Sequence, residues 1–202
     1  IEGDVVRDRT AAARIHRAIL IACVITVVPF MVWLLFAGDA WAAVTLVLVV
    51  FGVVAYSAPG LRFKEKPFLD SLTSALHFAG PLLYALVLTG QPLDGANVWP
   101  VWVAFILWGM ASHAFGAVQD VRADRAGGIG SVATVIGARA TVRVAVALYV
   151  VASAVLLTLP WPGAIAAVLP LAYVASTARF WNVTDDTCEA ANRGWKTFLW
   201  LN

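Results

Sequence analysis

Two aspartates and two arginines form the cluster in this sequence that is best equipped for chemistry. Asp120 and Asp124 are four residues apart, with Arg122 and Arg125 beside them, directly after a long apolar segment. If a helix continues through Asp124, its carboxylate shares one face with that of Asp120. Such a pair can bind Mg²⁺, which proteins usually hold through one or two carboxylates plus substrate phosphates. The arginines would offer forked donors to the remaining phosphate oxygens.

The same cluster has a second interpretation, in which the acids only balance the arginines at a membrane boundary. Spacing alone does not separate the two. His113 favours the metal site, because it lies seven residues before Asp120, two helical turns deeper on the same face. An ionisable ring within an apolar segment is costly unless it faces a cavity or a partner. Taken alone, His113 is more simply explained as a packed, hydrogen-bonded histidine, and the same holds for His77.

A second polar loop supplies hydroxyl and cationic groups. Tyr56 lies at the end of an apolar segment, and Arg62, Lys64 and Lys66 follow it. Positive charge of this kind can neutralise a diphosphate. Each residue taken singly also fits an interfacial tyrosine anchor followed by a basic loop at the membrane surface. The two polar loops can form one diphosphate site only if the fold brings them to the same side.

The elements that must position these residues are membrane-spanning helices. The chain of 202 residues is 61% hydrophobic and 13% charged, with a mean hydropathy of +0.84, whereas soluble domains are about 45–50% apolar and about 25% charged. A bilayer core of about 30 Å needs about 20 apolar residues per helix. Uninterrupted apolar runs indicate an all-α transmembrane bundle, since a barrel needs short alternating strands. Six segments qualify as spans: 18–37, 40–58, 71–89, 98–118, 141–159 and 163–180.

The placement of charge predicts the orientation of these spans. All 14 Lys and Arg residues lie before the first span or in alternate connections. The positive-inside rule makes that side cytoplasmic, so both polar loops face the cytoplasm of a cell membrane. Charges dispersed among membrane helices argue against nucleic acid as a partner. Cys23 within a span and Cys188 on the cytoplasmic side argue against a disulfide framework.

Residues 1–202 are expected to form a single membrane domain, because no Gly/Ser-rich or Pro-rich linker separates the spans. The sequence begins at Ile1 without a Met and ends at Asn202 just as a new apolar run begins. We therefore expect a fragment of a longer protein, cut at both ends. No protein partner can be inferred from the sequence.

The polar loops resemble a known family, the UbiA-type intramembrane prenyltransferases. Residues 109–116, the pair Asp120 and Asp124, and residues 128–134 resemble that family's second Asp-rich motif, in wording most similar to the lycopene elongases of the carotenoid branch. Residues 56–64 are similar to its other diphosphate-binding loop. The resemblance covers essentially the whole chain. It implies a bundle of nine helices, of which this chain would hold the third to the eighth.

This sequence departs from the family pattern in two places. The family's first Asp-rich motif has no match, and Glu2, Asp4 and Asp8 only imitate its spacing, so we expect them just downstream of it. In the polar loop, Gly60 occupies the place of the lysine that some relatives carry four residues after the tyrosine. Lys64 and Arg62 are therefore alternative ligands for the phosphate.

The resemblance implies that Mg²⁺ grips the diphosphate of a prenyl donor and that the prenyl group passes to a lipophilic acceptor inside the bundle. For a lycopene elongase the donor would be dimethylallyl diphosphate and the acceptor the end of a linear carotenoid. The implied roles are metal binding for Asp120 and Asp124, diphosphate binding for Arg62, Lys64, Arg122 and Arg125, substrate positioning or cation stabilisation for Tyr56, and cavity lining for His113.

Three alternatives remain open from the sequence. The acceptor of a prenyltransferase could instead be a quinone precursor or a chlorin. A transporter could use the Asp120 and Asp124 pair to gate a cytoplasmic mouth. Transporters often carry charged residues or broken helices at mid-membrane, whereas the span centres here contain no Asp, Glu, Lys or Arg, which favours an enzyme. A purely structural scaffold is the least favoured.

Overall fold

A computed structural model describes residues 2–201 of the chain, with side chains described from Ala12 onward. Those residues form helices and turns without a strand, which confirms the predicted all-α class. The long helices are α1 (Glu2–Ala37), α2 (Ala40–Ser57), α3 (Leu69–Leu88), α4 (Val98–Val118) and α7 (Ala138–Leu156). A sixth span is composite and consists of η2 (Gly163–Ala167), α8 (Val168–Thr177) and η3 (Ala178–Phe180).

Within the described part of the chain, six spans are long and apolar enough to cross a membrane, as predicted, and the chain is a multi-pass membrane protein. The spans over 98–118 and 163–180 have the predicted bounds. The others shift by a few residues, most at the first, whose apolar stretch begins at Ala12. Many large apolar side chains on these helices are exposed, as expected where the solvent is lipid. The side chains of Glu2, Asp4 and Asp8 lie outside the described residues.

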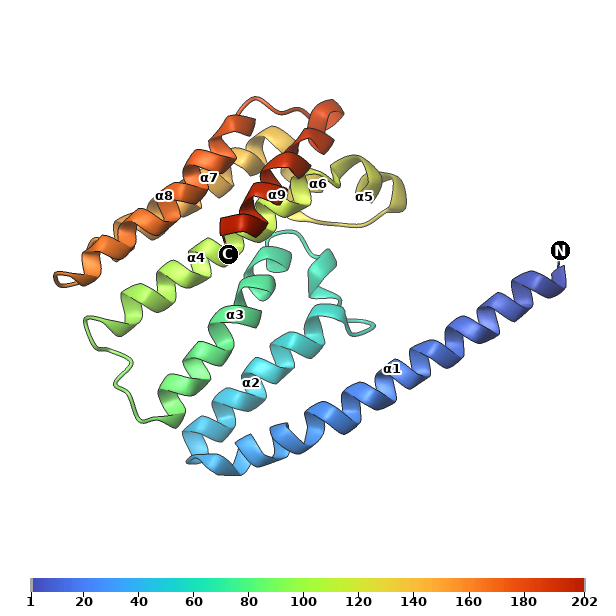
Figure 1. The fold of residues 1–202 in the computed structure, drawn as a ribbon, viewed down its shortest axis with the longest axis horizontal. Helices are drawn as coiled ribbons and strands as arrows, with labels where there is room; N and C mark the ends of the chain where they lie inside the picture. The colour runs from blue at the N-terminus through green and yellow to red at the C-terminus, as the bar shows by residue number, and fades with distance from the viewer. Residues whose placement is uncertain (1, 202) are drawn as a thin grey trace.

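The spans pack in the order in which the chain runs through them. α1 contacts α2, α2 contacts α3, α3 contacts α4, α4 contacts α7, and α7 contacts α8. Figure 1 shows α1 to α4 as a row, with α7 and α8 beside α4. Short connections such as Gly38–Asp39 allow antiparallel neighbours, and Asp39 begins α2 by accepting a hydrogen bond from the Ala42 N–H (2.9 Å).

Small residues let the central helices approach closely. A Cβ at Gly109 of α4 would lie only 2.9 Å from Cα of Ala75 on α3. Beside this contact, the Trp102 indole N–H donates to the Ala79 carbonyl (2.9 Å). Small residues and interhelical hydrogen bonds are the means by which helices associate where the lipid is as apolar as the side chains. The centre of the bundle is therefore fixed around α3, α4 and α7.

Among the residues whose side chains are described, the first helix is joined to the rest only near its C-terminal end. Every described side chain from Ala12 to Phe30 is exposed, and Figure 1 shows this part of α1 diverging from α2. Near the end of α1, Leu34 and its neighbours pack against the α2–α3 pair. The Tyr84 hydroxyl donates to the Leu34 carbonyl (2.7 Å).

Short helices gather at the end of the bundle that carries the polar loops. They are η1 (Phe63–Glu65), α5 (Val121–Gly127), α6 (Val132–Ile136), η4 (Asp185–Ala191) and α9 (Asn192–Leu201). The continuous helix through Asp124 that we considered is not formed. α4 ends at Val118, the Asp120 N–H bonds back to the Ala117 carbonyl (3.2 Å), and α5 begins at Val121. This tighter i to i+3 bond ends the α-helical ladder.

Candidate active site

A pocket of about 320 Å³ opens at the end of the bundle that carries the polar loops. We call it the charged pocket. Its lining comes from both polar loops, from the end of α4 and from the start of α9. The lining residues are Lys64, His113, Gly116, Ala117, Gln119, Asp120, Asp124, Ile129, Gly130, Ser131 and Trp195. The fold thus brings Lys64 together with both aspartates.

The two aspartates stay one turn apart although the helix is interrupted. The Asp124 N–H donates to the Asp120 carbonyl (2.8 Å), which preserves the helical spacing across the break. Burial raises the pKa of both carboxyl groups, and the charge of Asp120 raises the pKa of Asp124 further. Two carboxylates that disfavour each other's ionised form are suited to a cation that neutralises both.

The donor set fits Mg²⁺ together with a diphosphate. Among the described residues, no group of three or more His, Cys, Asp or Glu side chains is arranged to hold a metal ion. Asp120 and Asp124 alone would leave most of an octahedral shell to other oxygens, which is the usual situation for Mg²⁺ in sites that share the ion with substrate phosphates. Lys64, on the opposite loop, supplies positive charge to the same pocket.

A close backbone contact holds the Lys64 loop against the aspartate loop. A Cβ at Gly130 would lie 2.4 Å from the Glu65 carbonyl oxygen, so only glycine permits this approach. Glu65 follows Lys64 directly within η1. The position of Lys64 relative to the aspartates therefore depends on a residue without a side chain.

The three arginines expected at the diphosphate lie outside the pocket lining. Arg62 forms an ion pair with Glu65 in its own loop. Arg125 donates to the Asp185 carboxylate (2.5 Å) and to the Thr134 carbonyl (2.8 and 3.0 Å). Arg62 thus donates from two of its nitrogens and Arg125 from all three. Arg122 is exposed and does not line the charged pocket.

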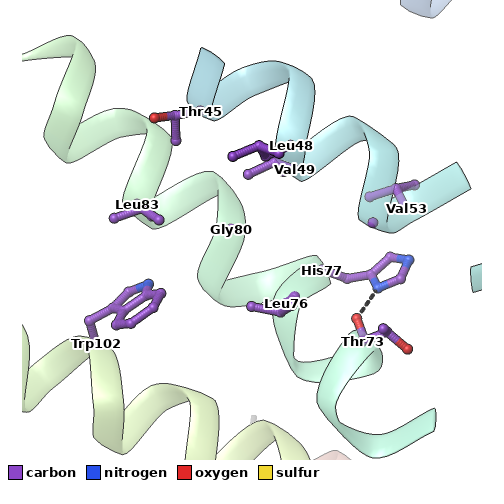
Figure 2. A pocket seen from close by; sticks show the side chains of 11 residues that line it. Thr45, Leu48, Val49, Val53, Thr73, Leu76, His77, Gly80, Leu83 and Trp102 are labelled. Carbon is purple, nitrogen blue, oxygen red and sulfur yellow. Dashed lines mark hydrogen bonds between the residues drawn. The ribbon is translucent and has the colours of Figure 1, made fainter. Parts of the chain in front are cut away.

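Tyr56 also lies outside the charged pocket. Its ring packs edge-on against His77, with the centroids 4.8 Å apart. His77 in turn lines a different pocket of about 240 Å³ between α2 and α3. Figure 2 shows that pocket, with apolar side chains such as Leu48 and Leu76 around it and His77 bonded to Thr73. The Thr73 carbonyl lies 2.7 Å from Nδ1 of His77 and can only accept, so Nδ1 carries the proton.

A buried carboxylate behind the pocket was missed by the sequence analysis. Asp70 is the second residue of α3 and is 0% exposed. Nε2 of His113 lies 3.7 Å from Oδ2 of Asp70, so the predicted cavity-lining histidine has an acidic partner on the next helix. Asp70 follows the basic loop directly. An acidic residue at the start of an apolar span is the feature of the sequence that could have singled it out.

An aromatic column leads from the charged pocket into the bundle. The Trp195 ring, which lines the charged pocket, stacks on Phe198 at 4.6 Å between centroids. Phe198 stacks on Trp108 at 6.0 Å. Trp108 and Tyr173 line an apolar groove of about 660 Å³ between α4, α7 and α8. Stacked rings therefore connect the charged pocket with an apolar groove, and an amphipathic substrate requires both kinds of surface.

Comparison with known sequences gives consistent matches. The UbiA prenyltransferase family matches residues 4–202. A lycopene elongase/hydratase of Corynebacterium glutamicum is 50% identical over 187 residues, which cover 93% of this chain and 65% of that protein. The C(50) beta-cyclic carotenoids biosynthesis protein LbtBC of Dietzia sp. is 52% identical over 188 residues, 93% of this chain and 43% of that protein.

A more distant lycopene elongase/hydratase, of Haloarcula japonica, is 31% identical over 155 residues, which cover 67% of this chain and 51% of that protein. The chain thus spans less than two thirds of the length of each of these relatives. No solved structure matches the chain significantly.

Proposed function

The chain belongs to the UbiA prenyltransferase family, and from this premise we propose that it is the membrane core of an enzyme that transfers a prenyl group from an allylic diphosphate to a lipophilic acceptor. The observation that carries the proposal is the charged pocket, where Asp120, Asp124 and Lys64 meet at the end of an apolar bundle. A transporter needs a polar path across the membrane. The centres of the described spans contain no Asp, Glu, Lys or Arg.

In this proposal Asp120 and Asp124 hold Mg²⁺. When bound, the ion supplies Lewis acidity that stabilises the charge of the diphosphate leaving group. Lys64 binds the same diphosphate as a point charge. His113, at the deep side of the pocket, contacts either the diphosphate or the first carbon of the prenyl group. Arg62 and Arg125 pair with other carboxylates, Tyr56 packs on His77, and Arg122 is exposed. The roles expected for these four residues stay predictions.

The reaction breaks the carbon–oxygen bond of the donor, and the diphosphate leaves with the electron pair. A double bond of the acceptor then supplies the electrons of a new carbon–carbon bond, and the cationic adduct either loses a proton or adds water and releases a proton from it. The aromatic column of Trp195, Phe198 and Trp108 lies on the way from the charged pocket to the apolar groove. Such rings exclude water and stabilise positive charge on the prenyl group.

The acceptor we propose is a linear carotenoid such as lycopene, and the donor is dimethylallyl diphosphate. The names of the relatives from Corynebacterium and Haloarcula support this choice, and the apolar groove of about 660 Å³ offers space for a polyene end. The partners of the chain are then these two substrates and the lipid bilayer, without nucleic acid. We further propose that the charged pocket faces the cytoplasm and that residues 1–202 are one domain of a longer chain.

The proposal is tested with the full-length protein in membrane vesicles, given labelled dimethylallyl diphosphate, Mg²⁺ and an acceptor. Lycopene should yield a longer labelled carotenoid, and an aromatic acid or a chlorin should not. Asp120→Asn should abolish the product, whereas Asp186→Asn should retain it, because Asp186 is an exposed acid near this end of the chain that does not line the pocket. Uptake of the substrates without any product would support a transporter and end the proposal.

A further inference from the structure

Asp70 is the only charged side chain that is buried among the residues whose side chains the structure describes. It lies at the first turn of α3, directly after the loop that carries Lys64. A carboxylate removed from solvent is costly unless donors compensate it. Its neighbours therefore indicate why the position carries a charge.

Three residues from three elements surround this carboxylate. Oδ1 accepts a hydrogen bond from the Ser71 N–H (2.7 Å), and Oδ2 accepts one from the Val132 N–H (2.8 Å). Nε2 of His113 lies 3.7 Å from Oδ2, at ion-pair distance. Asp70 thus joins the start of α3 to α4 and to the start of α6.

Two of these contacts reach the charged pocket although Asp70 does not line it. His113 lines the pocket directly, and its side chain is 22% exposed. Val132 follows Ser131, which also lines the pocket and begins α6 by accepting a hydrogen bond from the Thr134 N–H (3.2 Å). The Asp70 carboxylate therefore contacts His113, which lines the pocket, and Val132, which is next to the lining residue Ser131.

We propose that Asp70 is a positioning residue: it pairs with Nε2 of His113, so that Nδ1 faces the charged pocket and, in the imidazolium form of the ring, donates its proton to an oxygen of a bound diphosphate. The inference rests on the proposed function, since it takes the ligand of the charged pocket to be a magnesium diphosphate. A carboxylate that orients a functional imidazole through its other nitrogen is a common arrangement at ligand sites. The contact to Val132 keeps Ser131 and the aspartate loop in register with that ring.

A purely structural role is the competing explanation, in which Asp70 only ties α3 to α6. The two differ in how Asp70 and His113 depend on each other. If Asp70 acts through His113, its substitution has little effect once the imidazole is gone. If it only ties helices together, the effects of the two substitutions multiply.

The test is a double-mutant cycle in the full-length protein, with Asp70→Asn, His113→Leu and the double variant. Binding of pyrophosphate in the presence of MgCl₂ is the first readout, and KM and kcat for the prenyl donor are the second. Asp70→Asn should weaken pyrophosphate binding by about 10–100-fold, the usual effect of losing the partner of a ligand histidine. In the His113→Leu background it should change binding by less than about twofold. Asp39→Asn, at the start of α2, is the matched control and should bind as the wild type does, because asparagine also caps helices.

Equal losses with and without His113 would overturn the proposal, and so would an Asp70→Asn variant that binds like Asp39→Asn. Thermal unfolding of each variant in detergent shows whether it is folded. Should Asp70→Asn fail to fold, His113→Leu decides alone, since wild-type pyrophosphate binding by that variant removes the role of the ring. If the wild type binds magnesium pyrophosphate but prenylates none of the acceptors, the proposed function fails while the cycle still decides the role of Asp70.

Discussion

Gly130→Ala is the most direct test of how the charged pocket is assembled. The new Cβ would lie 2.4 Å from the Glu65 carbonyl oxygen, whereas ordinary contacts begin at 3.4 Å. The loop that carries Lys64 must therefore move about 1 Å away from the aspartates, because both contacting atoms are backbone or fixed to it. Overpacking of this kind costs about 1–3 kcal/mol.

This cost weakens the docking of the Lys64 loop on the aspartate loop, and we expect it to lower the affinity for the prenyl donor. A loss of 1.4 kcal/mol corresponds to about tenfold, so we expect kcat/KM for the prenyl diphosphate to fall by about 5–150-fold. The measurement is product formation by the full-length enzyme over a range of donor concentrations. KM for the lipophilic acceptor should stay unchanged, because the apolar groove lies away from this contact.

Gly127→Ala is the matched control in the same loop. Its Cβ would meet only the Ile129 side chain at 3.6 Å, which is ordinary van der Waals contact, and Gly127 does not line the charged pocket. This variant should behave as the wild type does. Equal kinetics of Gly130→Ala and Gly127→Ala would refute the argument that close approach of the two loops sets the position of Lys64.

Further outcomes follow from charge. Asp120→Asn should stabilise the metal-free protein at neutral pH by about 0.2–0.5 kcal/mol, the effect of like charges one turn apart. The folded-state pKa of Asp124 is raised, so Asp124 becomes protonated as the pH falls below that pKa, and the gain should then vanish in unfolding experiments. Asp185→Ala should cost about 0.5–2 kcal/mol, since the carboxylate caps Ala138 and binds Arg125. The hydrogen bond from Ala138, and then Arg125, lower the pKa of Asp185, so its contribution is complete above about pH 4 and should be lost only as pH falls through the lowered pKa. EDTA should stop product formation and added Mg²⁺ restore it; activity that survives EDTA would remove the metal from the proposal.

The sequence was sufficient for the architecture because hydrophobic length is a local property. Each span could be located from its own residues, and positive charge in alternate connections placed the two polar loops on one side. The shared pocket of Asp120 and Asp124 could be anticipated in the same way, because four residues separate them even across the interrupted helix. The features that could be predicted are those that depend on the residues of a single segment.

The contacts that decide which polar residues are available lie far apart in the sequence. Arg125 is held by Asp185, sixty positions later, and Asp70 by Val132, sixty-two positions later. No pattern within a short stretch of sequence predicts such long-range pairs. Arg62 is different, because Glu65 three residues on was a readable sign that the arginine already has a partner.

The succession of neighbouring spans also has a consequence for biogenesis. Since each span packs on the one made before it, every new helix finds its partner already in the membrane as it leaves the ribosome, and assembly can keep pace with synthesis. The polar mouth is an exception. Asp70 must wait for Val132, and so the carboxylate is hydrated or unpaired until the α4–α6 segment has been translated. This end of the bundle is therefore the last to be completed.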